Sequence, residues 1–125
     1  MKNTIIIAFL LLSTVAFSQT KKELLTKKWT LSKVIDFGQE YAPMDNQKGD
    51  WLEFTADGKF TGIMEGLHVE GTYTAGKSVI VKIDKTKSKL KVNWSKVKGL
   101  TKEQFKLEYQ NGDLITTTLI FVPEK

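Results

Sequence analysis

The fold of this chain is decided by the stretch Leu52-Glu53-Phe54-Thr55-Ala56-Asp57-Gly58-Lys59-Phe60. Apolar and polar residues alternate on both sides of its centre, which is the pattern of strands with one buried face. The central Asp57-Gly58 pair tolerates the positive φ values that tight hairpin turns require. The stretch therefore predicts two antiparallel strands joined by a short turn.

Similar runs, rich in Val, Ile, Thr, Phe and Tyr, recur along the chain at intervals of roughly ten residues. Asn111-Gly112 is a second strong turn signal, and Glu65-Gly66 is a plausible third. The predicted strands are 29–37, 50–55, 59–65, 67–75, 79–84, 89–94, 104–110 and 114–122. Short connections favour antiparallel neighbours, and closure removes exposed sheet edges. We therefore predict an all-β fold, an eight-stranded antiparallel up-and-down β-barrel, with a short N-terminal helix within 21–28.

The alternation also assigns an inward face to most strands. The register of 114–122 is ambiguous, although Leu119 and Phe121 form the better inward pair. The other residues expected to face inward are Phe60, Gly62, Met64, Val69, Gly71, Tyr73, Leu90, Val92, Trp94, Phe105, Leu107 and Tyr109.

Residues 1–19 have the pattern of a secretory signal peptide. A positive residue, Lys2, precedes the apolar run 5–17, and small residues flank Phe17 in Ala16-Phe17-Ser18. Cleavage is expected before Gln19 or Thr20, which leaves 20–125 as a single barrel domain without a transmembrane segment. Because the chain has no cysteine, it carries neither a lipoprotein anchor nor a disulfide. A periplasmic or secreted location is expected.

The charge of the chain limits its partners. The formal net charge is +5, and all basic residues are lysines. Without arginine the chain lacks the planar fork that reads guanine, so a sequence-specific nucleic-acid reader is not expected. The segment 82–98 holds seven lysines and a single acid, Asp84. In it, Lys87, Lys89 and Lys91 alternate along a predicted strand face, which either attracts an anionic partner or keeps the strand soluble.

Catalytic and metal-binding patterns are weak. His68 is the only histidine, so a zinc site with several Cys or His ligands is not expected. No serine lies in a nucleophile elbow. Glu65 and Glu70 could face each other across a hairpin, but exposed charges are the simpler interpretation. We expect no enzyme activity, no metal and no cofactor.

One connection, Gly38–Gly49, is long and contains no clear strand. Long loops are often functional. With the residue that follows it, this loop places Asp45, Asn46 and Asp50 near Gly49, which is similar to an oxygen-rich calcium loop, but the spacing matches no EF-hand. The expectation is a solvated loop.

Three motifs together resemble bacterial exported lipocalin-like domains. They are Lys27-Lys28-Trp29, the Asp57-Gly58 hairpin with its flanking aromatics, and Gly71-Thr72-Tyr73. The resemblance covers roughly 24–122. It implies a cup that binds a small apolar molecule, with the long first loop as a lid. It also implies that Trp29 packs at the barrel floor.

The predicted function is therefore the binding of a small hydrophobic ligand inside the barrel. The alternative is a solid barrel that contacts an anionic or protein partner in the cell envelope, since eight strands can enclose either a ligand or their own side chains. The side chains expected to line the ligand site are Phe54, Phe60, Met64, Tyr73, Trp94, Phe105 and Tyr109.

Overall fold

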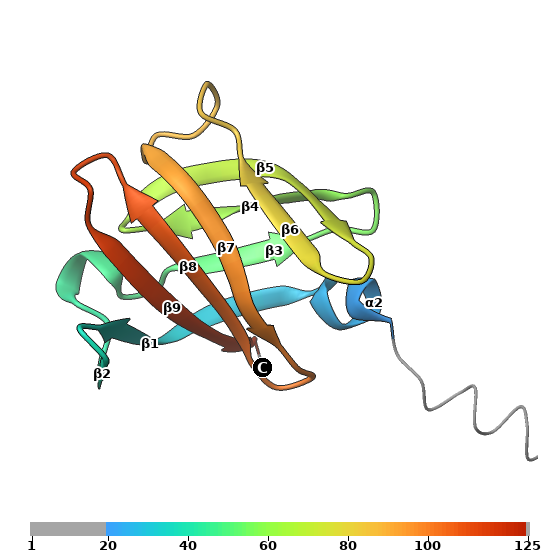
Figure 1. Cartoon of the computed structure of the whole chain (residues 1–125), viewed down its shortest axis with the longest axis horizontal. Coiled ribbons are helices and arrows are strands. Elements are labelled where there is room, and N and C mark those ends of the chain that lie inside the picture. Colours follow the sequence, from blue (N-terminus) through green and yellow to red (C-terminus); the bar gives the residue numbers. More distant parts are fainter. Residues whose placement is uncertain (1–19, 125) are drawn as a thin grey trace, which may run out of the picture.

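A computed structural model of the chain describes residues 20–124. The predicted signal peptide, 1–19, lies outside these residues. Within 20–124, no helix combines the length and the apolar character needed to cross a membrane. The described residues form a twisted barrel of antiparallel strands with one short helix at one end (Figure 1).

The chain forms nine strands, one α-helix and one 3₁₀ turn in the described part. The helix α2 spans Lys21–Leu25 and the 3₁₀ turn η1 spans Asp45–Gln47. The strands are β1 Lys28–Asp36, β2 Gln39–Tyr41, β3 Trp51–Phe54, β4 Lys59–Met64, β5 Leu67–Ala75, β6 Val79–Ile83, β7 Val92–Leu100, β8 Phe105–Asn111 and β9 Thr116–Pro123.

Eight of these strands form a nearly closed barrel in the order β6-β5-β4-β3-β1-β9-β8-β7, and every paired neighbour is antiparallel. The predicted all-β, eight-stranded barrel is confirmed. The short strand β2 pairs only with the end of β1, in a loop where no strand was predicted. The first and last strands of the order, β6 and β7, lie side by side without a backbone ladder. Across this seam the Ser95 hydroxyl donates a hydrogen bond to the Val81 carbonyl oxygen at 2.8 Å.

Two predicted turns have the expected backbone. Gly58 has a φ of 83°, and Glu65 and Gly66 have φ values of 52° and 73° in a two-residue turn between the paired Met64 and Leu67. The turn at Asn111 differs, because its positive φ falls at Leu114. The Asn111 side-chain oxygen accepts hydrogen bonds from the amides of Asp113 and Ile115, which holds a longer loop.

A strand follows β6 as predicted, but the predicted bounds 89–94 are wrong. Residues 84–91 form a loop, and β7 begins at Val92 and continues to Leu100. Ser88 explains the loop, because its hydroxyl bonds to both the amide and the carbonyl of Glu70 at 3.0 Å and takes the place of a ladder pair. Lys87, Lys89 and Lys91 therefore lie in this loop and do not alternate along a strand face.

The inward orientation predicted for Trp94 is also wrong. A bulge at Asn93 interrupts the pairing of β7 with β8, and Trp94 is 41% exposed on the outer wall. The Asn93 amide group donates to the Gln110 side chain and to the Asn111 carbonyl, both at 2.9 Å, which holds the bulge in place. The other residues predicted to face inward are buried, including Leu119 and Phe121 of the last strand, except Gly71, which is partly exposed.

One end of the barrel is closed by aromatic side chains and α2. The Trp29 indole is fully buried and donates a hydrogen bond to the Leu25 carbonyl at 2.9 Å, which ties the floor to the helix. The Lys27 ammonium lies 5.1 Å from the Trp29 ring centre, a cation–π distance. Phe105 lies 5.8 Å from Trp29 and 5.5 Å from Phe54, so ring packs against ring across this end.

Candidate functional site

The other end of the barrel is hollowed. It is formed by the β1–β2 hairpin, the segment 42–50, the β4–β5 turn and the β8–β9 loop, at the left of Figure 1. A hollow of about 190 Å³ lies there. Its lining residues are Val34, Asp36, Met44, Asn46, Gln47, Glu65, Tyr109, Asn111, Ile115 and Thr117. We call this region the mouth.

Tyr109 and Glu65 form the polar wall of the mouth. The Tyr109 side chain is almost fully buried, and its hydroxyl donates a hydrogen bond of 2.6 Å to a Glu65 carboxylate oxygen. Burial raises the pKa of Tyr109 well above its ordinary value, and the hydrogen bond to Glu65 raises it further. The phenol is therefore a fixed donor that orients the Glu65 carboxylate.

Asp50 holds this wall from behind. It is only 1% exposed, and its two carboxylate oxygens accept hydrogen bonds from the Glu65 amide at 2.7 Å and the Gly66 amide at 3.2 Å. Burial raises the pKa of Asp50 to about 6, although the two amides act in the opposite direction. The expectation of a solvated loop is wrong for Asp50, which fixes the β4–β5 turn from inside the barrel.

The long loop builds the outer part of the mouth. The buried Gln47 side chain accepts a hydrogen bond from the Met44 amide at 2.9 Å, which shapes the 3₁₀ turn. Beside it lies a second, mostly apolar hollow of about 400 Å³. This hollow shares Val34, Asp36 and Met44 with the mouth, so the two are adjacent. Its other lining residues are Phe37, Tyr41 and Ala42.

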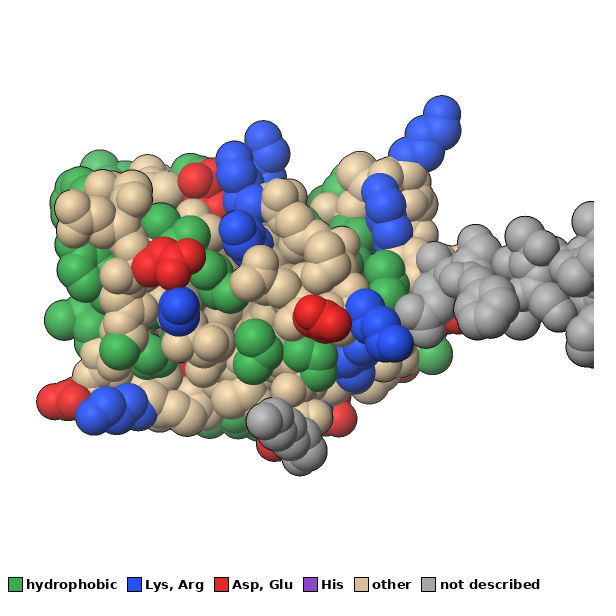
Figure 2. All heavy atoms as spheres, turned by 90° about the horizontal axis from the view of Figure 1, so that it is seen from below, with side chains coloured by type: hydrophobic (Ala, Val, Ile, Leu, Met, Phe, Trp, Pro, Cys, Tyr) green, Lys and Arg blue, Asp and Glu red, His purple; other side chains and the backbone are tan. Residues whose placement is uncertain are grey.

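Large apolar side chains at this end face solvent. Phe37 is 97% exposed, Leu114 is 71% exposed and Met44 is 68% exposed, and Tyr41 and Ile115 are also exposed. We call these five residues the rim. Phe37 and Leu114 adopt positive φ values of 51° and 66°, which are costly for side chains of this size. Figure 2 shows hydrophobic side chains gathered at the left edge of the molecule, the mouth end.

Most of the predicted ligand-lining residues lie at the closed end of the barrel, opposite the mouth. Phe54 packs on Phe60 at 5.3 Å and on Tyr73 at 5.4 Å between ring centres, and Phe105 completes the group. The Tyr73 hydroxyl donates a hydrogen bond of 2.5 Å to the Thr55 carbonyl, so this phenol already has a partner. These rings contact one another and fill the closed end.

The remaining predicted residues are separated in space. Met64 is fully buried, Trp94 lies on the outer wall, and Tyr109 alone of the seven borders the mouth. The sequence interpretation missed Asp50, Gln47 and the rim as site residues. The long loop pointed to Tyr41, Met44 and Gln47, and no signal in the sequence pointed to Leu114 or Ile115.

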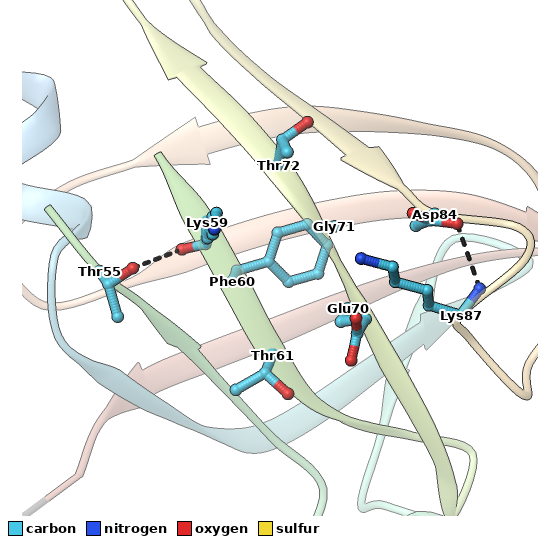
Figure 3. A pocket seen from close by; sticks show the side chains of 9 residues that line it. All are labelled: Thr55, Lys59, Phe60, Thr61, Glu70, Gly71, Thr72, Asp84 and Lys87. Atoms are coloured by element: carbon cyan, nitrogen blue, oxygen red, sulfur yellow. Dashed lines mark hydrogen bonds between the residues drawn. The ribbon is translucent and has the colours of Figure 1, made fainter. Parts of the chain in front are cut away.

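A further hollow of about 380 Å³ lies on the outer wall over β4 and β5. Figure 3 shows Lys59, Thr61 and Thr72 around the Phe60 ring, which is visible beside Gly71. A Cβ atom at Gly71 would overlap the backbone carbonyl oxygen of Lys82 and come within 2.9 Å of that ring, so glycine is needed for this close packing. Glu70, which was considered with Glu65 as a carboxylate pair, instead binds His68 at 2.8 Å. The two carboxylates therefore have different partners, since Glu65 accepts from Tyr109.

Comparison with known proteins finds no family model, no curated protein and no solved structure that matches the chain.

Proposed function

We propose that this protein is an exported, lipocalin-like binding barrel that holds a small amphipathic molecule at its mouth. The observation that carries the proposal is the rim, five large apolar side chains that face solvent around a polar hollow. Full burial of one such side chain is favourable by about 1.5–3 kcal/mol. A ligand with an apolar part would gain this energy on binding.

The proposed binding place is the mouth, because the aromatic rings at the closed end pack against one another. The apolar hollow beside Phe37 and Met44 would receive the apolar part of the ligand. The adjacent hollow beside Tyr109 and Glu65 would receive its polar head. The two volumes, about 400 Å³ and about 190 Å³, are in the range of small-molecule sites.

The polar lining indicates the kind of head group. Asp36 and Glu65 contribute carboxylates, and neither hollow is lined by a lysine. A head that donates hydrogen bonds, and an ammonium in particular, would complement these acceptors, whereas a carboxylate would be repelled.

Other features of the chain support the same proposal. The signal-like pattern of 1–19 supports export to the periplasm or the medium. Trp29 and the Lys27 side chain over it form a closed floor of the kind that the lipocalin resemblance implies. The proposal assigns the mouth a role in binding and no turnover.

The test is a titration of the purified protein with decylamine, which is an ammonium at neutral pH, followed by calorimetry and amide chemical shifts. We expect binding, with shifts at Phe37, Met44 and Glu65. The variant Phe37→Ser/Met44→Ser should weaken binding by about tenfold or more, since two large apolar contacts are lost. The matched control is Ile80→Ser, an exposed apolar residue of the outer wall. Failure of the wild type to bind, or equal losses in both variants, would refute the proposal.

A further inference from the structure

The strands β6 and β7 lie side by side in Figure 1 without a backbone ladder, and the seam between them is a second candidate binding place. A hollow of about 360 Å³ lies along it, and its lining differs from that of the mouth in charge and composition. Its lining residues are Ile80, Val81, Lys82, Ile83, Lys85, Val92, Asn93, Trp94 and Ser95. No carboxylate is among them.

Backbone donors face this hollow. The Asp84 amide bonds to the Glu70 carbonyl on β5. Because successive residues of a strand point their amides to opposite sides, the amides of Val81 and Ile83 point away from β5 and toward β7. Since β7 forms no ladder with β6, these amides have no strand partner. The edge of a sheet with free amides is a known form of anion site.

Lysine side chains add positive charge at the same place. Lys82 and Lys85 are exposed, and neither takes part in an ion pair within residues 20–124. Asp84 lies between these two lysines in the sequence but does not line the seam hollow, and its carboxylate accepts hydrogen bonds from Thr86 and from the Lys87 amide within its own loop. The seam therefore combines ammonium groups and free amides.

Apolar side chains lie beside these charges. Ile80 is 52% exposed and Trp94 is 41% exposed, both on the outer wall. The hydrogen bond between Ser95 and Val81 holds the two strands together here, and Ile80, Lys82 and Trp94 line the same hollow. Lysines that merely protect a sheet edge would not need an exposed tryptophan among them.

The size of the gap selects the occupant. An added β-strand needs about 4.8 Å on each side of it. Ser95 already bridges β6 and β7 with a single side-chain hydrogen bond of 2.8 Å, which leaves no room for another strand. We propose that the β6–β7 seam binds a small amphipathic anion. Its anionic head lies against Lys82, Lys85 and the seam amides, and its apolar body covers Ile80 and Trp94.

The experiment uses decanoate, which has an alkyl chain as long as that of decylamine and the opposite charge, below its micelle concentration. We expect saturable binding to the whole protein, with amide shifts at Val81 and Ile83 and a change in fluorescence that Trp94→Phe removes. The variant Lys82→Gln/Lys85→Gln should bind about tenfold more weakly. The control Lys22→Gln/Lys102→Gln removes the same charge from α2 and from the β7–β8 turn, and it should bind like the wild type.

Each other outcome overturns the proposal. Equal losses in the two lysine variants would mean a nonspecific effect of net charge. Decylamine shifts at the seam equal to those of decanoate would remove the anion preference. Binding to phosphatidylglycerol vesicles but not to free decanoate would identify the seam as a membrane-docking surface. Since Phe37→Ser/Met44→Ser leaves the seam intact, it should still bind decanoate, so the mouth and the seam fail or succeed independently.

Discussion

Asp50 gives the most direct test of the structure, because a buried carboxylate makes stability depend on pH in a defined direction. The perturbation is Asp50→Asn, which keeps the size of the side chain and removes its charge. Asparagine also loses one of the two oxygens that accept the Glu65 and Gly66 amides. That loss costs about 1–3 kcal/mol at every pH and must be separated from the effect of charge.

The magnitude follows from the pKa of Asp50, which burial raises from 3.8 to about 6 in the folded protein. A raised carboxyl pKa means that the folded state binds the proton more tightly than the unfolded chain does. Its contribution to stability is therefore complete below pH 3.8 and is lost as the pH rises through about 6. The full shift corresponds to at most about 3 kcal/mol, and half of that is a cautious lower expectation.

The assay is urea unfolding followed by tryptophan fluorescence, at about pH 4 and about pH 7, for wild type and variant. The free energy of unfolding of Asp50→Asn relative to wild type should rise by about 1.5–3 kcal/mol from the lower to the higher pH. Asp57 and Asp84 have lowered pKa values and act in the opposite direction, but they are present in both proteins and cancel. Asp45→Asn, in the same loop but exposed, should show no such rise. A relative stability of Asp50→Asn that stayed constant within about 0.5 kcal/mol would refute the assignment of Asp50 as a buried charge.

Three further substitutions test other parts of the molecule. Gly71→Ala should destabilise the barrel by about 2 kcal/mol or more, because its Cβ would overlap the backbone carbonyl oxygen of Lys82 and would meet the Phe60 ring at 2.9 Å, whereas Gly76→Ala, with open space around it, should stay within about 0.5 kcal/mol in thermal unfolding. Tyr109→Phe should cost about 1–3 kcal/mol in urea unfolding, since it leaves Glu65 without its donor, and a neutral effect would mean that the 2.6 Å hydrogen bond is not made in solution. Phe37→Asn should stabilise the protein by about 0.5–1 kcal/mol, because asparagine accepts a positive φ more readily, and it should weaken decylamine binding; a loss of stability would contradict the strain argument.

The barrel could be predicted from the sequence because its signals are local. Asp57-Gly58 sets a turn, and the alternation of Phe105, Leu107 and Tyr109 sets a face, without reference to any distant residue. The order of pairing then follows from short connections. Only the register of 114–122 was ambiguous, and the structure resolves it in favour of Leu119 and Phe121.

The errors arose where distant side chains replace backbone pairing. Residues 89–94 alternate as well as any strand, but Ser88 bonds to Glu70, eighteen residues earlier, and ends the ladder. Asn93 likewise bonds to Gln110 across the β7–β8 pair and turns Trp94 outward. A pattern of hydrophobicity contains no information about such contacts, because a serine or an asparagine in it is simply polar.

The mouth was hidden from the sequence for the same reason. Tyr109 and Glu65 are forty-four residues apart, and Asp50 is fifteen residues from Glu65, whose amide donates a hydrogen bond to it. Tyr109 is ordinary in its strand, and Glu65 and Asp50 are ordinary polar residues of a turn and a loop. The folded barrel brings them together, so that the Glu65 carboxylate accepts a hydrogen bond from the buried phenol and its amide donates one to Asp50.

The distribution of charge has a consequence for any search for a ligand. The net charge of +5 suggests an anion-binding protein, yet neither mouth hollow is lined by a lysine, whereas the seam is lined by lysines and no acid. Attraction by net charge acts over long distances and is screened by salt, but the preference of each site is set by the groups within a few ångströms. A screen limited to anions would therefore report only the seam. Amphipathic ligands of both charges, tested at more than one ionic strength, are needed to detect binding at the mouth and at the seam.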